Sequence, residues 1–462
     1  MGDRDLIMAR RIAEAAAAEG GRAYFVGGFV RDRLMGRENK DIDLEVHGLS
    51  VETLTRILSE LGEPLLIGAS FGVMGLRHYA LDIAMPRSET ATGRGHRDFA
   101  VSVDPFLGEE RAAKRRDFTI NAMMEDVLSG EVLDFFGGRE DLKNRRIRHV
   151  CDRSFAEDPL RVFRACQFAA RFDFSVAPET VSLCSRMALD ALARERVMGE
   201  LEKALIKAEK PSIFFRELRR MGQLGFWFPE LEALVGVPQP PKYHPEGDVW
   251  THTMQVLDEA ALLRGEAKQP LWFMLAALCH DLGKPETTEL IDGEYHAYRH
   301  EIAGQRIVRA FLDRLTGETR LKEYVLNMVE LHMAPNLMAR SDAKHRIWMR
   351  LYDRSCCPED LLLLAKADFL GCHGPDQTRE EGLRLYAPTE EKLRMLLADY
   401  HELTARPYVM GRDLIEAGMS PGPSFTAALE YAHKLRLAGF SKEEQLRQTI
   451  ASFRRTQKPD GS

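Results

Sequence analysis

The stretch Tyr24–Glu45 reads YFVGGFVRDRLMGRENKDIDLE, and the rest of the chain is interpreted outward from it. It predicts an apolar strand, a turn at Gly27 and Gly28, a short basic helix, and a second strand that carries Asp41 and Asp43. Residues i and i+2 of a strand point to the same face, so the two carboxylates lie side by side. Paired carboxylates are costly unless a cation neutralises them, and Mg²⁺ with a bound triphosphate is the usual occupant. The pattern therefore favours a nucleotidyl-transfer site.

The glycine turn and the helix after it supply groups that suit a phosphate. Gly27 and Gly28 let the backbone approach a phosphate closely, and Arg31 on the next helix can grip phosphate oxygens. A Gly-Gly turn alone is weak evidence, and an isolated D-x-D is often a solvated loop. The ordered combination GG-x-VRD-x-L-x-G followed by D-I-D-L is more specific. It resembles the first signature of the class II tRNA nucleotidyltransferases (CCA-adding enzymes) and bacterial poly(A) polymerases.

Length, charge and cysteine usage limit the class of protein. The 462 residues suggest about two to four domains. The net charge of -7 argues against general affinity for nucleic acid, so RNA contacts must come from local basic clusters such as residues 114–118 and 143–149. We expect no membrane segment and no signal peptide. Seven scattered cysteines without a CxxC pair favour a reducing compartment, so we expect a cytoplasmic protein.

After the first motif, Ser50 is expected to cap an amphipathic helix, and residues 64–85 to form two or three short strands. Asp82 ends the last of these strands. It is interpreted either as a third carboxylate near the metal or as a strand-end residue without a role. Residues 86–110 are polar, contain glycine and lack a clear period, which predicts a long loop. The family resemblance implies a mobile loop here that helps the final adenosine addition.

The string KRRDFTINAM at residues 114–123 predicts an anion-binding corner, because two arginines precede a helix N-terminus. A capping role for Asp117 is the structural alternative. RRDFTINA resembles the second signature of the family. The resemblance implies that Arg116 contacts the nucleotide phosphates, and that Asp117 and Asn121 shape the sugar site.

A helical period begins after Ser154, with Asp158 expected at an N-cap and Pro159 at the first helical position. Asp158, Arg161 and Arg164 recur every three residues, which is typical of one side of a helix. Intrahelical ion pairs are one interpretation. The other is the E-D-x-x-R motif of the family, which implies that Asp158 and Arg161 select CTP and ATP and that Arg164 contacts the nucleotide. Residues 195–207 resemble the fifth signature and are expected to be scaffold.

A second constellation follows the proline-rich segment 237–247, which is the best domain boundary in the chain. Histidines and aspartates at several helix ends are a metal-binding pattern. Their arrangement, with an adjacent His-Asp pair after an apolar helix, resembles the HD phosphohydrolase domain. The resemblance implies the metal ligands His252, His280, Asp281 and Asp368, with His300 and His332 accessory. The histidine of HAYRH at position 296 belongs to the same set of candidates.

These patterns predict an α+β fold: a small mixed β-sheet nucleotidyltransferase head at the N-terminus, then an all-helical neck and body and an all-helical HD domain. The expected parts are a nucleotidyltransferase head (1–138), a helical neck with RNA-binding and nucleotide-selecting functions (139–236), an HD phosphohydrolase domain (237–375), and a C-terminal helical tail (376–462).

The resemblance implies an enzyme that adds CMP, CMP and AMP to the 3′ end of tRNA, with tRNA, CTP and ATP as partners. Asp41 and Asp43 would hold Mg²⁺, and the HD site would take Mn, Ni, Zn, Fe or Mg. Alternatives are a poly(A) polymerase, a CC-only or A-only enzyme, or an HD-superfamily nucleotide phosphohydrolase. Two further alternatives are disfavoured. Guanosine-tetraphosphate synthetase/hydrolases also combine the two folds, but in the opposite domain order. A non-catalytic RNA-binding protein would not need both the D-I-D and HD pairs. The oligomeric state stays open.

Overall fold

The computed structural model describes residues 2–39, 41–68, 73–91, 99–341, 343–374, 376–406 and 408–454. Contacts between residues divide the chain into two compact units, Met1–Pro229 and Glu230–Ser462. Each unit is described by itself below. The finer predicted limits at residues 138, 236 and 375 remain predictions, and residue 375 lies outside the described residues, as do residues 455–462 of the predicted tail.

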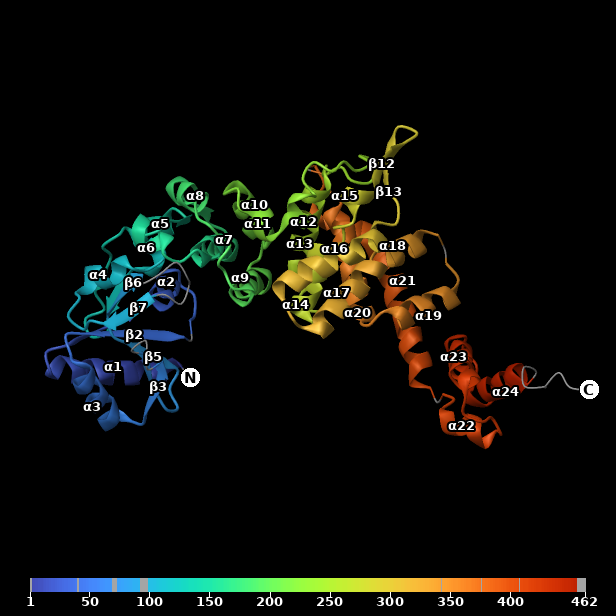
Figure 1. The fold of residues 1–462 in the computed structure, drawn as a ribbon, viewed down its shortest axis with the longest axis horizontal. Helices are drawn as coiled ribbons and strands as arrows, with labels where there is room; N and C mark the ends of the chain where they lie inside the picture. The colour runs from blue at the N-terminus through green and yellow to red at the C-terminus, as the bar shows by residue number, and fades with distance from the viewer. Residues whose placement is uncertain are drawn as a thin grey trace, which may run out of the picture. The chain divides into compact units, whose positions relative to one another are not determined.

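A seven-stranded mixed sheet in the order β3-β4-β5-β2-β1-β8-β9 organises the first unit (Figure 1). β2 and β5 run parallel, whereas the other neighbouring strands of this sheet are antiparallel. Its strands are β1 (Arg22–Val26), β2 (Ile42–His47), β3 (Pro64–Gly68), β4 (Val73–Leu76), β5 (Leu81–Ala84), β8 (Met124–Asp126) and β9 (Val132–Leu133). Helix α1 (Gly2–Ala18) contacts β1, β2 and α3 (Val51–Leu61), and their apolar side chains form one core with the sheet. Ser50 caps α3 as predicted, since its side chain accepts a hydrogen bond from the Thr53 amide at 3.2 Å.

The predicted long loop at residues 86–110 is only partly a loop. Strands β6 (Arg87–Ala91) and β7 (Phe99–Val103) pair in an antiparallel hairpin, and α4 (Glu109–Lys114) follows. The segment was misjudged because its strands lack the alternation of apolar and polar residues that marks a half-buried strand. Residues 92–98 lie outside the described residues.

The rest of the first unit is mainly helical, as predicted. Its elements are α2 (Gly28–Leu34), a 3₁₀ turn η1 (Thr119–Asn121), α5 (Gly138–Lys143), α6 (Asp152–Ala156), α7 (Leu160–Phe172), α8 (Pro178–Cys184), α9 (Arg194–Lys207), α10 (Ser212–Arg220) and α11 (Leu224–Trp227). A short parallel pair, β10 (Arg146–Ile147) and β11 (Ser175–Val176), lies among them. Helix α7 packs against α9 and α10 and so carries the central residues of this region.

The second unit is built from helices and one exposed hairpin. The boundary of the two units falls within α12 (Pro229–Glu232). The following elements are α13 (Val249–Leu263), α14 (Pro270–Cys279), α15 (Lys284–Thr287), β12 (Thr288–Ile291), β13 (Glu294–Ala297), α16 (His300–Leu315), α17 (Thr319–Leu331), α18 (Met333–Arg340), α19 (His345–Arg354), α20 (Pro358–Gly371), α21 (Arg379–Ala405), α22 (Gly411–Glu416), α23 (Pro423–Leu437) and α24 (Lys442–Arg454). Helix α14 is apolar and buried, and it contacts α13, α17 and α20, so it forms the centre of this unit.

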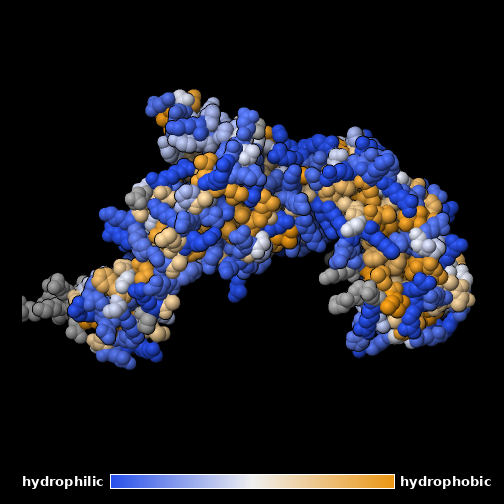
Figure 2. All heavy atoms as spheres, turned by 180° about the vertical axis from the view of Figure 1, so that it is seen from behind, coloured by the Kyte–Doolittle hydropathy of each residue, from blue (hydrophilic) through white to orange (hydrophobic). Residues whose placement is uncertain are grey.

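Polar side chains cover most of the face shown in Figure 2, with apolar side chains exposed between them. Such scattered apolar exposure is normal for a folded protein. Among the described residues, no helix is both long and apolar enough to cross a membrane. The seven cysteines, all of them in described segments, are free thiols.

Candidate active sites

Three aspartates lie near one another where β2 and β5 run side by side. Asp43 lies in β2, Asp41 directly precedes this strand, and Asp82 in β5 stands opposite Asp43 in the parallel register. The sequence left Asp82 open between a third carboxylate and a strand-end residue, and the structure places it beside Asp43. Strand pairing decides this neighbourhood, and pairing between distant strands cannot be read from local sequence.

A cation would stabilise the ionised form of the carboxylate group formed by Asp41, Asp43 and Asp82. Burial raises the pKa of Asp43 to about 6, with the charges of Asp82 and Asp41 acting in the same direction and that of Arg116 against them. Asp41 and Asp82 are exposed, so the group opens to solvent. Carboxylate oxygens with solvent access are suitable ligands for a hard divalent cation.

The glycine turn faces these carboxylates, as the sequence predicted. Gly27 has a positive φ of 67°, and a Cβ atom at this position would lie 3.2 Å from Arg116 Nη1 and 3.5 Å from Asp43 Oδ2. The missing side chain therefore leaves space between a guanidinium and a carboxylate. A phosphate group that is held by both a metal and an arginine would need this space.

Glu45 anchors Arg116 and was not singled out by the sequence. Its Oε2 lies 3.1 Å from Arg116 Nη2 and 3.4 Å from Arg115 Nη2. Burial alone would raise the pKa of Glu45, but a hydrogen bond with His47 and the charges of the two arginines lower it to about 2. Nε of Arg116 is buried without a hydrogen-bond partner among the described residues. Arg116 is thus held in place and retains donor capacity for an anion.

A chain of hydrogen bonds joins four of the predicted nucleotide-binding residues. Arg31 Nη1 donates to Asn121 Oδ1 at 2.6 Å, and Asn121 Nδ2 donates to Asp117 Oδ1 at 3.0 Å. Arg164 Nε on α7 donates to Asp117 Oδ2 at 2.8 Å. Arg31 is only 3% exposed and also pairs with Asp32, so its guanidinium is largely committed to protein partners. The contact of Arg31 with a phosphate therefore remains a prediction.

Gly28 lies against the same network. A Cβ atom at Gly28 would be 3.4 Å from Arg31 Nη2 and 3.6 Å from Asn39 Nδ2. Asp117 also accepts a hydrogen bond from the Phe118 amide at 2.8 Å. The expected capping role is wrong, because η1 begins at Thr119 and its N-cap, Phe118, has no side-chain cap hydrogen bond.

Asp158 and Arg161 lie at the start of α7 but hold different parts of the unit. Asp158 pairs with Arg196 on α9 at 3.0 Å, and Arg161 donates to the carbonyl oxygens of Ser154 at 2.7 Å and Arg115 at 3.0 Å. Arg196 was missed because residues 195–207 were interpreted as scaffold. The helix also begins one residue later than predicted: α7 starts at Leu160, whose amide donates to Asp158 Oδ1 at 3.1 Å. The Pro159 dihedrals are already helical, so the disagreement is small.

The second unit brings together all six predicted HD residues. His252 lies on α13, His280 and Asp281 follow α14, and Asp368 lies on α20. His300 begins α16, and His332 lies between α17 and α18. The potential ligand atoms form two groups, one of His252, His280 and Asp368 and one of Asp281, His300 and His332. The remaining candidate, His296, lies on β13 and stacks on Tyr298 with ring centroids 5.0 Å apart.

Hydrogen bonds fix the tautomers of the three histidines at helix ends. Nδ1 of His280 donates to the Ala277 carbonyl at 2.8 Å, because a carbonyl oxygen can only accept. His300 and His332 make the same contact with the carbonyl three residues before them, at 2.8 and 2.6 Å. The Nε2 atom of each ring therefore remains for a ligand in the neutral form.

These Nε2 atoms face one another. Nε2 of His280 lies 3.2 Å from Nε2 of His252, and Nε2 of His300 lies 3.3 Å from that of His332. Burial and the neighbouring positive charges lower the pKa of His332 to about 3, so its ring is neutral. A cation can take the place of the proton that such a pair of imidazole nitrogens otherwise shares in a hydrogen bond. The arrangement thus fits a metal centre.

Asp281 joins the two groups. Its Oδ2 lies 3.2 Å from His280 Nε2, and its Oδ1 lies 3.2 Å from His300 Nε2. Lys284 Nζ approaches Oδ2 at 2.7 Å, but neither carboxylate oxygen receives a hydrogen bond of good geometry from the described residues. Burial opposes ionisation of Asp281, yet the charges of His280 and Lys284 hold its pKa well below the usual range. A buried, ionised carboxylate of this kind also suits a metal.

A cavity of about 630 Å³ gives access to this centre. Its lining includes Asp281, His300 and Asp368 together with Lys284, Tyr243 and Tyr298. A volume of this order is typical of a small-molecule site.

Three family models match the chain in order. The Poly A polymerase head domain matches residues 23–148, the "Probable RNA and SrmB- binding site of polymerase A" matches residues 173–234, and the HD domain matches residues 249–370. Solved structures with the same fold include a Bacillus stearothermophilus CCA-adding enzyme in complex with CTP, at 22% identity, 98% coverage of both chains and a TM-score of 0.64. A Thermotoga maritima CCA-adding enzyme complexed with tRNA is 21% identical, with 98% coverage of both chains and a TM-score of 0.61.

Curated relatives are more similar in sequence. The Multifunctional CCA protein of Methylococcus capsulatus is 36% identical over 454 residues, which cover 95% of this chain and 99% of the relative. That of Alkalilimnicola ehrlichii is 37% identical over 412 residues, which cover 86% and 94%. The chain therefore belongs to the family of multifunctional CCA proteins, CCA-adding nucleotidyltransferases in which a poly(A) polymerase-type head precedes an HD domain.

Proposed function

We propose that the first unit adds CMP, CMP and AMP, taken from CTP and ATP, to the 3′ end of tRNA. The observation that carries the proposal is the carboxylate group of Asp41, Asp43 and Asp82 opposite the Gly27 turn and Arg116. Family membership supports the same activity.

Asp41 and Asp43, with Asp82 beside them, would hold Mg²⁺. The bound ion would neutralise the triphosphate and lower the pKa of the attacking ribose hydroxyl. Arg116, anchored on Glu45, would contact the phosphates across the space at Gly27. Asp117 and Asn121 would orient the sugar, because their hydrogen-bond chain already fixes both side chains.

Base selection would fall to Asp158 and Arg161. Arg196 holds the Asp158 carboxylate in place, and backbone carbonyls hold the Arg161 guanidinium. A guanidinium has five N–H groups, so two hydrogen bonds to carbonyls leave donors for a base edge. With Asp158 as acceptor and Arg161 as donor, these two residues would distinguish CTP and ATP from other nucleotides without a nucleic-acid template.

One assay tests the reaction and separates its alternatives. The protein is incubated with tRNAs that end before CCA, after C and after CC, with CTP and ATP supplied separately, and the products are sequenced. We expect CMP on the first two substrates and AMP on the third. Tails on unstructured RNA with no addition to any tRNA would contradict the proposal in favour of a poly(A) polymerase. Addition of C alone or A alone would identify a CC-only or A-only enzyme.

A second activity, metal-dependent phosphohydrolysis, is favoured by the facing Nε2 atoms of the HD centre. His252, His280, Asp281 and Asp368 would hold the metal, with His300 and His332 completing a second position. The candidates are Mn, Ni, Zn, Fe and Mg, since nitrogen and oxygen ligands accept all of them. Chelator-treated protein is supplied with each ion and assayed for phosphate release from nucleoside monophosphates and ring opening of cyclic nucleotides. Absence of both reactions with every ion would refute this activity.

A further inference from the structure

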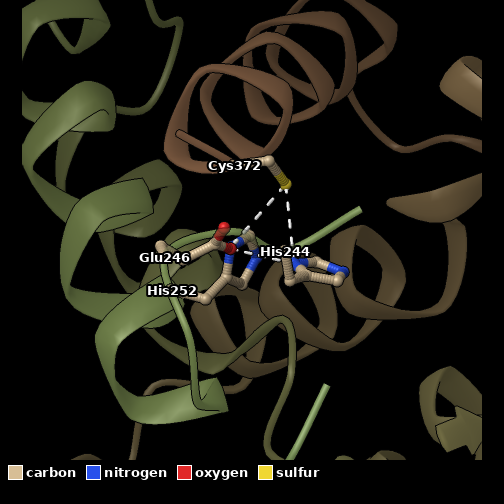
Figure 3. A group of neighbouring side chains, drawn as sticks. All are labelled: His244, Glu246, His252 and Cys372. Carbon is tan, nitrogen blue, oxygen red and sulfur yellow. Dashed lines mark hydrogen bonds and ion pairs between the residues drawn. The ribbon is translucent and has the colours of Figure 1, made fainter. Parts of the chain in front are cut away.

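Four side chains form a group directly behind the HD centre: His244, Glu246, His252 and Cys372 (Figure 3). They come from the segment before α13, from α13 itself and from the residues after α20. One potential ligand atom from each residue lies within 4.8 Å of the others. Only His252 is shared with the HD centre.

Four potential ligand atoms lie close together in this group. Glu246 Oε1 lies 2.9 Å from His244 Nδ1 and 2.8 Å from His252 Nδ1. Cys372 Sγ lies 3.7 Å and 3.8 Å from the same two nitrogens. The sulfur–nitrogen distances are those of two donors that share a tetrahedral zinc ion, whereas the shorter carboxylate–imidazole distances are those of hydrogen bonds that an ion would replace. Figure 3 shows the sulfur and the carboxylate directed toward the two rings.

Glu246 adds a second observation. Its side chain is 0% exposed, and its Oε2 has no hydrogen-bond partner among the described residues. A buried carboxylate oxygen without a partner is destabilising, and more so when the group is charged. A cation within the group would remove this cost.

We propose that His244, Glu246, His252 and Cys372 form an additional metal site that takes Zn²⁺ or a similar thiophilic divalent ion. Two imidazole nitrogens, one carboxylate oxygen and one thiolate sulfur are a zinc-type donor set. The HD centre contains only nitrogen and oxygen donors. The sulfur therefore lets the two sites prefer different ions.

His252 connects the two sites through its two ring nitrogens. Nε2 faces Asp368 at 3.2 Å and His280, while Nδ1 faces Glu246 and Cys372. With metals on both nitrogens, His252 would bridge the two sites as an imidazolate, and the Nδ1 proton that it otherwise donates to Glu246 would be released to solvent. Ions can enter from the cavity, because His244 and Cys372 both line it. The proposal does not depend on phosphohydrolase activity.

Cobalt provides a direct test, because a thiolate bound to Co²⁺ gives a charge-transfer absorption band in the near ultraviolet. The full-length protein is treated with chelator and titrated with Co²⁺. We expect the band in the wild type, its loss in Cys372→Ser, and its retention in Cys356→Ser, which removes an exposed cysteine. Bound zinc measured by mass spectrometry should fall by one ion per chain in Cys372→Ser only.

A second variant keeps the test decisive if Cys372→Ser proves unstable. His244→Ala should shift the Co²⁺ titration of the band by about tenfold or more, because one of four ligands is lost. Absence of the band in the wild type overturns the proposal and leaves Glu246 as a hydrogen-bond partner that orients His252. An unchanged band in Cys372→Ser, or an unchanged titration in His244→Ala, also overturns it.

Discussion

Asp41 and Asp43 lie two residues apart and face Asp82 on the neighbouring strand, whereas His252, His280 and Asp368 come from three different helices. The first group is partly exposed and has Arg116 beside it. The HD centre is almost fully buried, and its imidazole nitrogens face one another. We infer that the first site gains its ligand geometry from strand pairing, while the second needs a cation to complete its core.

The largest expected effect is that a substitution in either site abolishes the activity of that site alone. Asp43→Ala should lower nucleotide addition by about a thousandfold and leave phosphohydrolysis unchanged, because the carboxylate touches only the first site. His280→Ala should do the reverse. Steady-state assays of both activities measure this, with Asp190→Ala as an exposed carboxylate control in the first unit. Loss of both activities in either variant would refute two independent sites.

Metal removal should separate the two units. A metal present at a hundred times its Kd stabilises the folded state by about 2.7 kcal/mol, and a chelator abolishes this term. We expect faster amide hydrogen exchange in α13, α14 and α20 after chelation, and little change in β2 and β5. Equal loss of protection in both units would contradict a larger contribution of the bound metal to the buried helical centre than to the partly exposed carboxylates.

The buried pair of Asp117 and Arg164 tests the charged network of the first site at the level of stability. Burial opposes ionisation, but the charge of Arg164 keeps the pKa of Asp117 below its usual value. Its contribution to stability is therefore present above about pH 4, the ordinary range of the group, and is lost as the pH falls through the lowered value. Asp117→Asn should cost about 2 kcal/mol at pH 7 and progressively less below pH 4.

Denaturant unfolding at several pH values measures this effect. Asp173→Asn is the matched control, since Asp173 pairs with Arg145 at 3.4 Å with both side chains more than half exposed. An exposed pair contributes about 0.5 kcal/mol or less. A penalty for Asp117→Asn that does not change with pH would show that the ion pair is not its source.

The smallest effect concerns the space at the glycine turn. Gly27→Ala and Gly36→Ala both place a side chain at a positive φ, 67° and 66°, and should destabilise the fold by about 1 kcal/mol each. Only the Gly27 Cβ meets Arg116 and Asp43, whereas Gly36 has nothing within 4 Å. We expect Gly27→Ala alone to raise KM for CTP and ATP, by about tenfold or about 1.4 kcal/mol. Equal KM values in the two variants would contradict the binding of a nucleotide phosphate in this space.

Several site features were predictable because they are local in sequence. Asp43 lies on β2 and Asp41 directly before this strand, and a Gly-Gly turn precedes both, so neighbouring residues alone define this part of the site. His280 and Asp281 were recognisable because they follow an apolar helix directly. The pairing of the β6–β7 hairpin escaped prediction, since its strands lack apolar alternation.

Other features depend on contacts between distant segments. The position of Asp82 beside Asp43, the anchoring of Arg116 by Glu45 and the pairing of Asp158 with Arg196 join residues that are far apart in the chain. The group of His244, Glu246 and Cys372 spans more than a hundred residues. The spacing of residues along the chain does not predict such contacts.

By itself, then, the sequence determined the α+β organisation, the D-I-D carboxylates, the arginine motif and the HD residues, because each follows from periodicity, turn chemistry or a short motif. Only the tertiary structure decided which carboxylate becomes the third member of the first site and which donors stand behind His252. The physical reason is that strand register and helix packing are set by burial of the whole core, and not by the residues that the packing brings together.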